Sequence, residues 1–225
     1  MKLLAFDTST ETLSVAVACA GQPLLEHRGP GGAHASETLV PTIQSLLAHA
    51  GVTLGELDAI VFGRGPGSFT GLRTACSVAQ GLGFGANVAL LPVDTLLAVA
   101  EQARGVAGAT RVVAVLDARM DEVYFGRYVH AAGHWRVDEP PRLGRPEDVR
   151  PPEGWTIAGN AGPAYGARFG RVGEHIAALP TAAALLRLAP GMLAEGKGLR
   201  AADALPLYIR DKVAQTMQER ASLRR

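Results

Sequence analysis

The chain has 225 residues, of which 48% are hydrophobic and 19% are charged, and its formal net charge is +1 at pH 7. This composition predicts a soluble globular protein with a sizeable core, arranged as one large domain or two small ones. It argues against a free-standing nucleic-acid binder, because such a protein ordinarily has a high pI and a clustered basic face. We therefore expect any contact with RNA to be shared with another protein.

The two cysteines, Cys19 and Cys76, have neither C-x-x-C spacing nor a secreted context. They are interpreted as buried thiols in a reducing cytosol. Asp7 interrupts the N-terminal apolar run, so no signal peptide is predicted. The most apolar long window, residues 81–100, is broken by polar residues and a proline and predicts no membrane span. These features favour a cytoplasmic location.

The first half predicts an antiparallel meander followed by strands that alternate with helices. Short apolar runs predict strands at residues 3–6, 13–19, 23–28, 59–62 and 88–93. Helical spacing of apolar or small residues predicts helices at residues 35–50, 71–85 and 95–104.

The second half opens as the first does. Strands are predicted at residues 112–116, 123–129 and 135–137, and a short strand with a glycine-bearing turn at 155–162. A long loop is predicted at 139–152, a helix kinked or split by Pro190 at 181–195, an extended segment at 205–210 and a polar helix or frayed tail from 211. A strand, an aspartate-led turn and a second strand thus occur twice, at Asp7 and at Asp117. We therefore predict two related α/β lobes, residues 1–107 and a smaller 108–225, with the C-terminal tail packing back on the first lobe.

The central motif, residues 58–83, combines a buried strand, the glycine turn GRGPG and a helix that Ser68 or Thr70 can cap. Such a geometry suits an anion, because free N–H groups and the helix dipole converge there. However, the lysine of a nucleotide P-loop is absent, and Ser68 stands where G-x-G-x-x-G requires its third glycine. The motif therefore favours packing and close approach of a protein partner over nucleotide binding by the turn alone.

Two helix faces are candidates for a partner interface, since small residues let helices approach closely and Arg73 and Gln80 border them. The same positions could equally form core. The candidate interface residues are Leu39, Ile43, Leu46, Leu47, Leu72, Arg73, Cys76, Ala79, Gln80 and Gly83.

The Asp7 and Asp117 turns are the best candidates for acid chemistry, with Ser9 beside the first. Two carboxylates facing a cleft could hold hydrated Mg²⁺ beside phosphates, or each could only bond turn N–H groups. His130 and His134 have the i, i+4 spacing of zinc ligands, but their flanks predict a hairpin tip, so no metal site is assigned. No activated nucleophile is recognisable, and no catalytic residue is assigned.

Five segments together resemble one family over essentially the whole chain. They are DTST (residues 7–10), FGRGPGSFTGLR (62–73), AQGL (79–82), LDARMDEVY (116–124) and PLYIRDKVA (206–214). The family is that of the bacterial tRNA threonylcarbamoyladenosine biosynthesis proteins TsaB, also called YeaZ. The resemblance implies an α/β, two-lobed fold of the actin-like ATPase and sugar kinase (ribonuclease H-like) type, with duplicated mixed-sheet domains.

The resemblance also implies a role. The Asp7 and Asp117 turns would be vestiges of the two phosphate loops, and the turn at residues 159–162 would stand at the adenosine loop. Members are regarded as non-catalytic scaffolds for a paralogous catalytic subunit, which transfers threonylcarbamoyl to the adenine adjacent to the tRNA anticodon. The interface would use helices 35–50 and 71–85, with a homodimer when the chain is alone.

A third, ATPase subunit would join that pair, and tRNA would be contacted only indirectly. No cofactor would be bound tightly, with ATP and Mg²⁺ entering only within the complex. The alternatives are a small-molecule kinase or ATPase that uses Asp7 and Asp117, and a zinc peptidase that uses His130 and His134.

Overall fold

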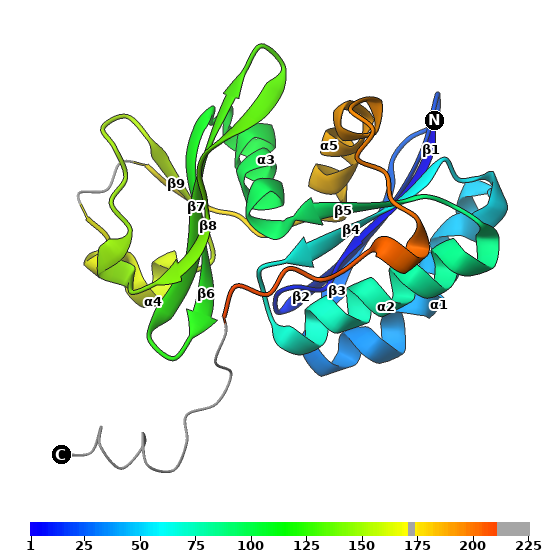
Figure 1. Ribbon diagram of the computed structural model, residues 1–225, viewed down its shortest axis with the longest axis horizontal. Coiled ribbons are helices and arrows are strands. Elements are labelled where there is room, and N and C mark those ends of the chain that lie inside the picture. Colours follow the sequence, from blue (N-terminus) through cyan, green and yellow to red (C-terminus); the bar gives the residue numbers. More distant parts are fainter. Residues whose placement is uncertain (171–173, 211–225) are drawn as a thin grey trace.

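The computed structural model describes residues 1–170 and 174–210, which form two five-stranded sheets with helices between and around them (Figure 1). The first lobe contains β1 (Lys2–Asp7), β2 (Thr12–Cys19), β3 (Leu25–Pro30), α1 (Ala35–Ala50), β4 (Ala59–Gly65), α2 (Phe69–Ala86), β5 (Leu90–Asp94) and α3 (Thr95–Ala107). The second contains β6 (Arg111–Arg119), β7 (Glu122–Ala131), β8 (His134–Gly144), β9 (Thr156–Gly159), α4 (Gly162–Tyr165) and β10 (His175–Ala177), and α5 (Ala182–Ala194) follows.

The first sheet has the order β3-β2-β1-β4-β5 and is covered on both faces. Alternation along β1 sends Leu4 and Phe6 to one face, where α1 and α2 pack, and Leu3 and Ala5 to the other, where α3 and α5 pack. Because both faces of its central strands are buried, those strands are apolar throughout, as the sequence predicts.

The second sheet repeats the topology of the first. Its order is β10-β9-β6-β7-β8, so that β6 pairs antiparallel with β7 and parallel with β9, as β1 does with β2 and β4. The predicted fold class, two duplicated mixed-sheet lobes, is confirmed.

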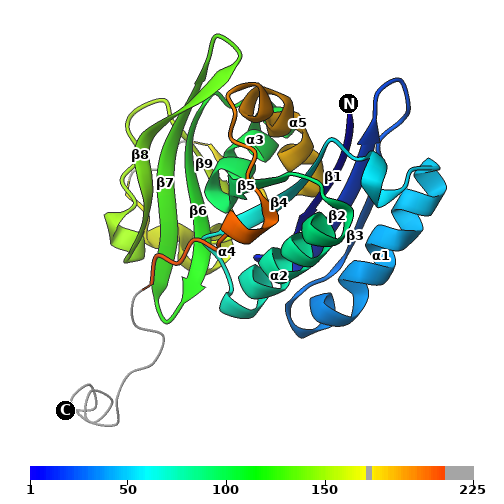
Figure 2. The same ribbon diagram turned by 45° about the vertical axis from the view of Figure 1, so that its right-hand side comes forward.

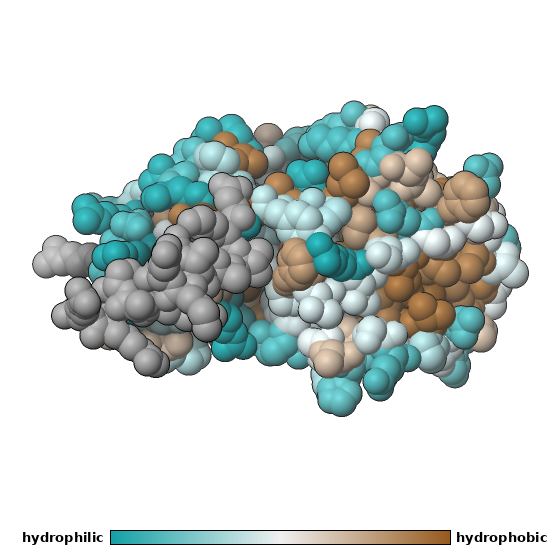
Figure 3. Space-filling view, turned by 60° about the horizontal axis from the view of Figure 1, so that its bottom comes forward, coloured by the Kyte–Doolittle hydropathy of each residue, from teal (hydrophilic) through white to brown (hydrophobic). Residues whose placement is uncertain are grey.

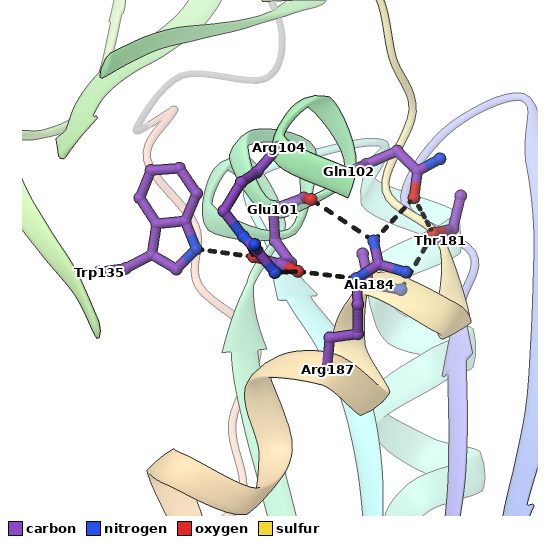
Figure 4. A network of polar contacts seen from close by, with 7 residues as sticks. All are labelled: Glu101, Gln102, Arg104, Trp135, Thr181, Ala184 and Arg187. Carbon is purple, nitrogen blue, oxygen red and sulfur yellow. Dashed lines mark hydrogen bonds and ion pairs between the residues drawn. The ribbon is translucent and has the colours of Figure 1, made fainter. Parts of the chain in front are cut away.

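The lobes meet at α3 and α5. Glu101 on α3 is only 2% exposed and accepts hydrogen bonds from Arg104, from Trp135 Nε1 on β8 (2.8 Å) and from Arg187 Nε on α5 (2.7 Å) (Figure 4). Burial by itself raises the pKa of Glu101, but these donors outweigh it and hold that pKa below the ordinary value. One buried carboxylate therefore ties both lobes together.

The chain does not stay in the second lobe after β10. Helix α5 returns to pack on β1, β2 and β4 of the first sheet, and Leu90 and Leu199 exchange backbone hydrogen bonds (Figures 1 and 2). The division of the chain into lobes after residue 107 stays a prediction. Helix α5 lies beyond that residue in the sequence but contacts the first sheet. The predicted polar helix or tail from residue 211 lies outside the described residues.

Two local predictions are wrong. The segment 139–152 is not all loop, because β8 continues to Gly144 through Pro140 and Pro141. These prolines are tolerated since β8 is the edge strand of its sheet. Pro190 does not split its helix either, because α5 runs unbroken from Ala182 to Ala194.

Candidate functional site

The glycines of the central motif pack against the first aspartate turn. A Cβ on Gly63 would overlap Asp7, one on Gly67 would overlap Ser9, and one on Gly71 would overlap the carbonyl of Thr8. The motif therefore needs glycines for close approach, but the approaching backbone is that of its own chain. The packing predicted for this turn is therefore present, whereas close approach of a partner there stays a prediction.

Hydrogen bonds fix the same contact. The backbone N–H of Ser68 donates to the carbonyl of Ser9 (2.7 Å), and the Thr8 hydroxyl donates to the carbonyl of Gly71 (2.7 Å). Ser68 caps α2 by accepting from the N–H of Gly71 (3.2 Å), as the sequence predicts. One N–H group of the motif, that of Ser68, is thus already bonded to the first aspartate turn of the same chain.

Asp7 is fully buried at the end of β1. Its Oδ1 accepts from the N–H (2.9 Å) and the hydroxyl (2.6 Å) of Ser9, whereas its Oδ2 has no hydrogen-bond partner among the described residues. Burial raises the pKa of Asp7 to about 6, although the two bonds from Ser9 act to lower it. The carboxyl group therefore belongs to the interior.

Asp117 instead lines a cavity of about 240 Å³ between the lobes, as do Ser9 and Ser68. Asn160 closes one side of it. The Asn160 Oδ1 accepts from the N–H of Asp117 (2.9 Å), and the Asn160 Nδ2 donates to Glu11 in the first lobe (3.2 Å). The family resemblance implied that this asparagine stands at the adenosine loop, but no sequence signal indicated that it bridges the lobes.

Asp7 and Asp117 do not form a shared Mg²⁺ site in this cavity, because Asp7 is not among the residues that line it. A second cavity of about 420 Å³ adjoins it at Glu11 and Asn160. Asp117 is engaged by the N–H and the guanidinium of Arg119, the latter at 3.3 Å. The structure brings Ser9 and Asp117 to one cavity but leaves Asp7 behind that wall.

The two histidines lie at the tip of the β7–β8 hairpin, as predicted from their flanks. His130 pairs with Trp135 across the strands, and their rings meet edge-on at 5.1 Å. Within residues 1–170 and 174–210, no group of three or more His, Cys, Asp or Glu side chains is arranged to hold a metal ion.

Most of the predicted interface residues are core residues. Seven of the ten are buried inside this chain: Leu39, Ile43, Leu47, Leu72, Cys76, Ala79 and Gly83. The small face of α2 serves its own sheet, because a Cβ on Gly83 would lie 2.6 Å from the Leu90 Cδ2. Periodicity identified the face correctly but not the neighbour that it meets.

The remaining three lie nearer the surface. Leu46 is half-buried against the same core, Arg73 is exposed, and the half-buried Gln80 donates to the carbonyl of Ala204 (2.9 Å). That any of these ten residues contacts a partner stays a prediction; among them, Arg73 is exposed on the outer face of α2.

That outer face carries two exposed aromatic rings. Phe84 is 84% exposed and Phe69 is 40% exposed, with Arg73, Ser77 and Gly81 between them at helical spacing. Beside Phe84 opens an apolar groove of about 630 Å³, walled by the end of α2 and residues 198–202. Figure 3, which views this side of the molecule, shows hydrophobic surface gathered on the part formed by the first lobe.

The chain has two related sheets around a cleft, and each sheet contributes an aspartate turn. This arrangement defines a two-lobed α/β protein of the actin-like ATPase and sugar kinase class. The family model of TsaD, tRNA N6-adenosine threonylcarbamoyltransferase, matches residues 31–182. No helix in the described part of the chain is long and apolar enough to cross a membrane.

The relatives are more specific. The chain is 37% identical to the tRNA threonylcarbamoyladenosine biosynthesis protein TsaB of Escherichia coli (strain K12) over 95% of this chain and 96% of that protein. YeaZ from Pseudomonas aeruginosa superposes with a TM-score of 0.86 at 42% identity, over 92% of this chain and 99% of that one. A second structure, with a TM-score of 0.86 and 41% identity, is described as an uncharacterized protein with similarity to peptidase YeaZ from P. aeruginosa. The chain belongs to the TsaB (YeaZ) family.

Proposed function

We propose that this protein acts in the biosynthesis of tRNA threonylcarbamoyladenosine as a non-catalytic scaffold subunit in the cytoplasm. Its relatives of similar length carry that pathway in their names. In this proposal the chain binds and orders a paralogous catalytic threonylcarbamoyl transferase, an ATPase subunit joins the pair, and tRNA is reached only through the complex. Alone, the chain forms a homodimer through the same surface.

One observation carries the proposal: an exposed apolar face on α2 accompanies a glycine turn that is packed against its own chain. Phe84, at 84% exposure, is an unusually open aromatic side chain beside an apolar groove. Exposed apolar patches of this kind mark protein–protein contact sites. The Ser68 N–H, one of the donors that could hold a phosphate, is bonded to the Ser9 carbonyl of the first turn, which favours binding over phosphoryl chemistry.

The direct test is association of the purified chain with the paralogous catalytic subunit, measured by calorimetry. We expect Phe84→Asp to weaken binding about tenfold or more and to lower tRNA modification in the reconstituted system in parallel. The matched control is Val106→Asp, the same type of change at a 60% exposed position on α3. Full binding and modification by Phe84→Asp would contradict the proposed surface.

The competing function is a small-molecule kinase or ATPase, which the shared fold keeps open. Calorimetry of the isolated chain with ATP and Mg²⁺ separates the two. The scaffold proposal expects no binding at micromolar ATP, whereas binding that Asp117→Ala abolishes would favour the kinase.

A further inference from the structure

Residues 204–210, here called the strap, cross from the first lobe to the second after the 3-10 turn Ala201–Asp203. In Figure 1 they run along α2, past the end of β4, and reach the turn between β6 and β7. Nothing in the proposed scaffold role uses this segment, yet it contacts both the outer face of α2 and the cleft turn of the other lobe.

The first contact is with α2. The carbonyl of Ala204, a fully buried residue, accepts from the Gln80 Nε2 (2.9 Å). Further along, the Tyr208 hydroxyl accepts from the Arg73 Nε (3.2 Å), and its ring lies 5.5 Å from that of Phe69. The Arg73 guanidinium also lies 3.7 Å from the Phe69 ring centre. The strap is therefore bonded to side chains of the proposed docking face.

The middle contact is with the glycine turn. The N–H of Leu207 donates to the carbonyl of Arg64 (2.7 Å). A Cβ on Gly65 would lie 2.6 Å from the Leu207 carbonyl, and the φ of Gly65 is +122°. Both facts require glycine at this position. The glycine motif therefore contacts the strap on one side and the Asp7 turn on the other.

The far contact is with the second lobe. Arg210 Nη2 donates to the carbonyl of Ala118 (3.0 Å) and to the Glu122 Oε2 (2.7 Å), and the Arg210 side chain is only 14% exposed. Between those two partners, Arg119, Met120 and Asp121 have φ values of 61°, 57° and 61°.

Three consecutive left-handed residues that are not glycine are costly and persist only when their surroundings hold them. Two arginines do so here. Arg210 binds one side of the turn, and Arg168 forms an ion pair with Asp121 on the other. The same turn carries Asp117 and Arg119, which line the cavity between the lobes. Arg210 therefore contacts the same turn that contributes residues to the wall of that cavity.

We propose that the strap is a mechanical link between the outer face of α2 and the β6–β7 turn. Arg210 is its positioning residue: it holds the turn in its left-handed conformation and so sets the shape of the cleft. A partner that engages Phe69 and Arg73 acts through Tyr208 on that turn; this last step rests on the proposed scaffold function, whereas the link itself does not.

Amide hydrogen exchange of the full chain tests the link by changing one end and measuring the other. We expect Arg210→Ala to accelerate exchange of residues 118–122 about tenfold, and Tyr208→Ala, at the α2 end, about threefold. The control is Arg200→Ala, which removes an arginine whose ion pair with Asp203 is local and exposed. It should leave the turn at the wild-type rate.

Glu122→Gln removes the charged acceptor from the other lobe and serves if Arg210→Ala does not fold. The measured quantity is the rate of amide exchange in residues 118–122. The link is overturned if this rate stays within about twofold of wild type in Tyr208→Ala and also in either Arg210→Ala or Glu122→Gln.

A second arm adds the catalytic subunit. Slower exchange of residues 118–122 in the wild-type complex, but not in the Arg210→Ala complex, supports transmission, and equal exchange in both refutes it. If the subunit does not bind at all, the scaffold function fails, while the exchange of the free chain still decides the link.

Discussion

The two aspartate turns occupy equivalent places in two equivalent sheets, yet their surroundings have diverged. Asp7 is sealed beneath the glycine motif, and its Oδ2 has no hydrogen-bond partner in the described chain. Asp117 borders an open cavity and is held by polar groups of Asn160 and Arg119. The repeated topology therefore preserved the sheets without preserving the contacts of the turns.

The cause lies in the helix that succeeds the central parallel strand of each lobe. After β4 comes the 18-residue α2, whose start is pressed onto the first turn, whereas after β9 comes the four-residue α4. One feature is shared: Gly63 and Gly159 each leave room for the neighbouring strand, β1 or β6. A long helix with a glycine-rich start closes the first turn, and a short one leaves the second open.

The strongest test of this comparison is to force the closed turn apart. A side chain at position 71 would overlap the Thr8 carbonyl, so we expect Gly71→Val to destabilise the fold by about 4 kcal/mol in urea unfolding. Gly81→Ala is the matched control on the same helix, because a Cβ there meets nothing within 4 Å. It should be neutral or stabilising by up to about 1 kcal/mol. Equal effects of the two changes would mean that the contact with Thr8 is not tight.

A pH series examines the sealed carboxyl itself. The pKa of Asp7 is raised from 3.8 to about 6 in the folded chain, so the folded state holds its proton more tightly than the unfolded state does. The contribution of Asp7 to stability is therefore full below pH 3.8 and is lost as the pH rises through about 6. Asp7→Asn has no carboxyl group to titrate and does not show this loss. The unfolding free energy of Asp7→Asn relative to that of wild type should therefore rise by about 3 kcal/mol between pH 3.8 and about pH 6. Parallel curves for the two proteins would show that Asp7 titrates normally.

A smaller effect is expected where the lobes join. Removing the shared carboxylate in Glu101→Ala leaves the Arg187 Nε and the Trp135 indole without their acceptor, whereas the Arg187 Nη2 keeps Gln102. We expect a loss of about 2 kcal/mol, less than for a fully buried pair because both arginines keep part of their hydration. Thermal unfolding against Glu195→Ala, which breaks only an exposed pair with Lys197, is the measurement. If Glu101→Ala unfolds at the same temperature as the wild type, Glu101 does not stabilise the contact between the lobes.

The smallest effect concerns the open turn. Asn160→Ala removes the acceptor for the Asp117 N–H and the contact with Glu11 across the cleft, at a cost of about 1 kcal/mol. Since water can replace both partners, we expect no loss of folding cooperativity in chemical denaturation. A loss above that of Gly71→Val would reverse the ranking of the two turns.

Much of this architecture could be predicted from local patterns. Alternating and 3.6-residue periodicities placed nearly every strand and helix, and the repeated strand–aspartate–strand pattern predicted two related lobes. Ser68 as the cap of α2 was also predictable from residue type. The start of β8 was predicted, but its continuation to Gly144 was missed because its two prolines are acceptable only at a sheet edge, and edge position is not a local property.

The sequence by itself determined that residues 63–71 must accept a close neighbour and that one face of α2 must be small. Only the tertiary structure decided which neighbours these are: the Thr8–Ser9 turn, Leu207 of the strap and Leu90 of the sheet. The physical reason is separation along the chain. A glycine indicates that space is needed, but the atoms that fill the space come from residues far away in the sequence, 63 positions away in the case of Thr8 and Gly71. Their placement is settled only when both sheets and the returning chain have packed.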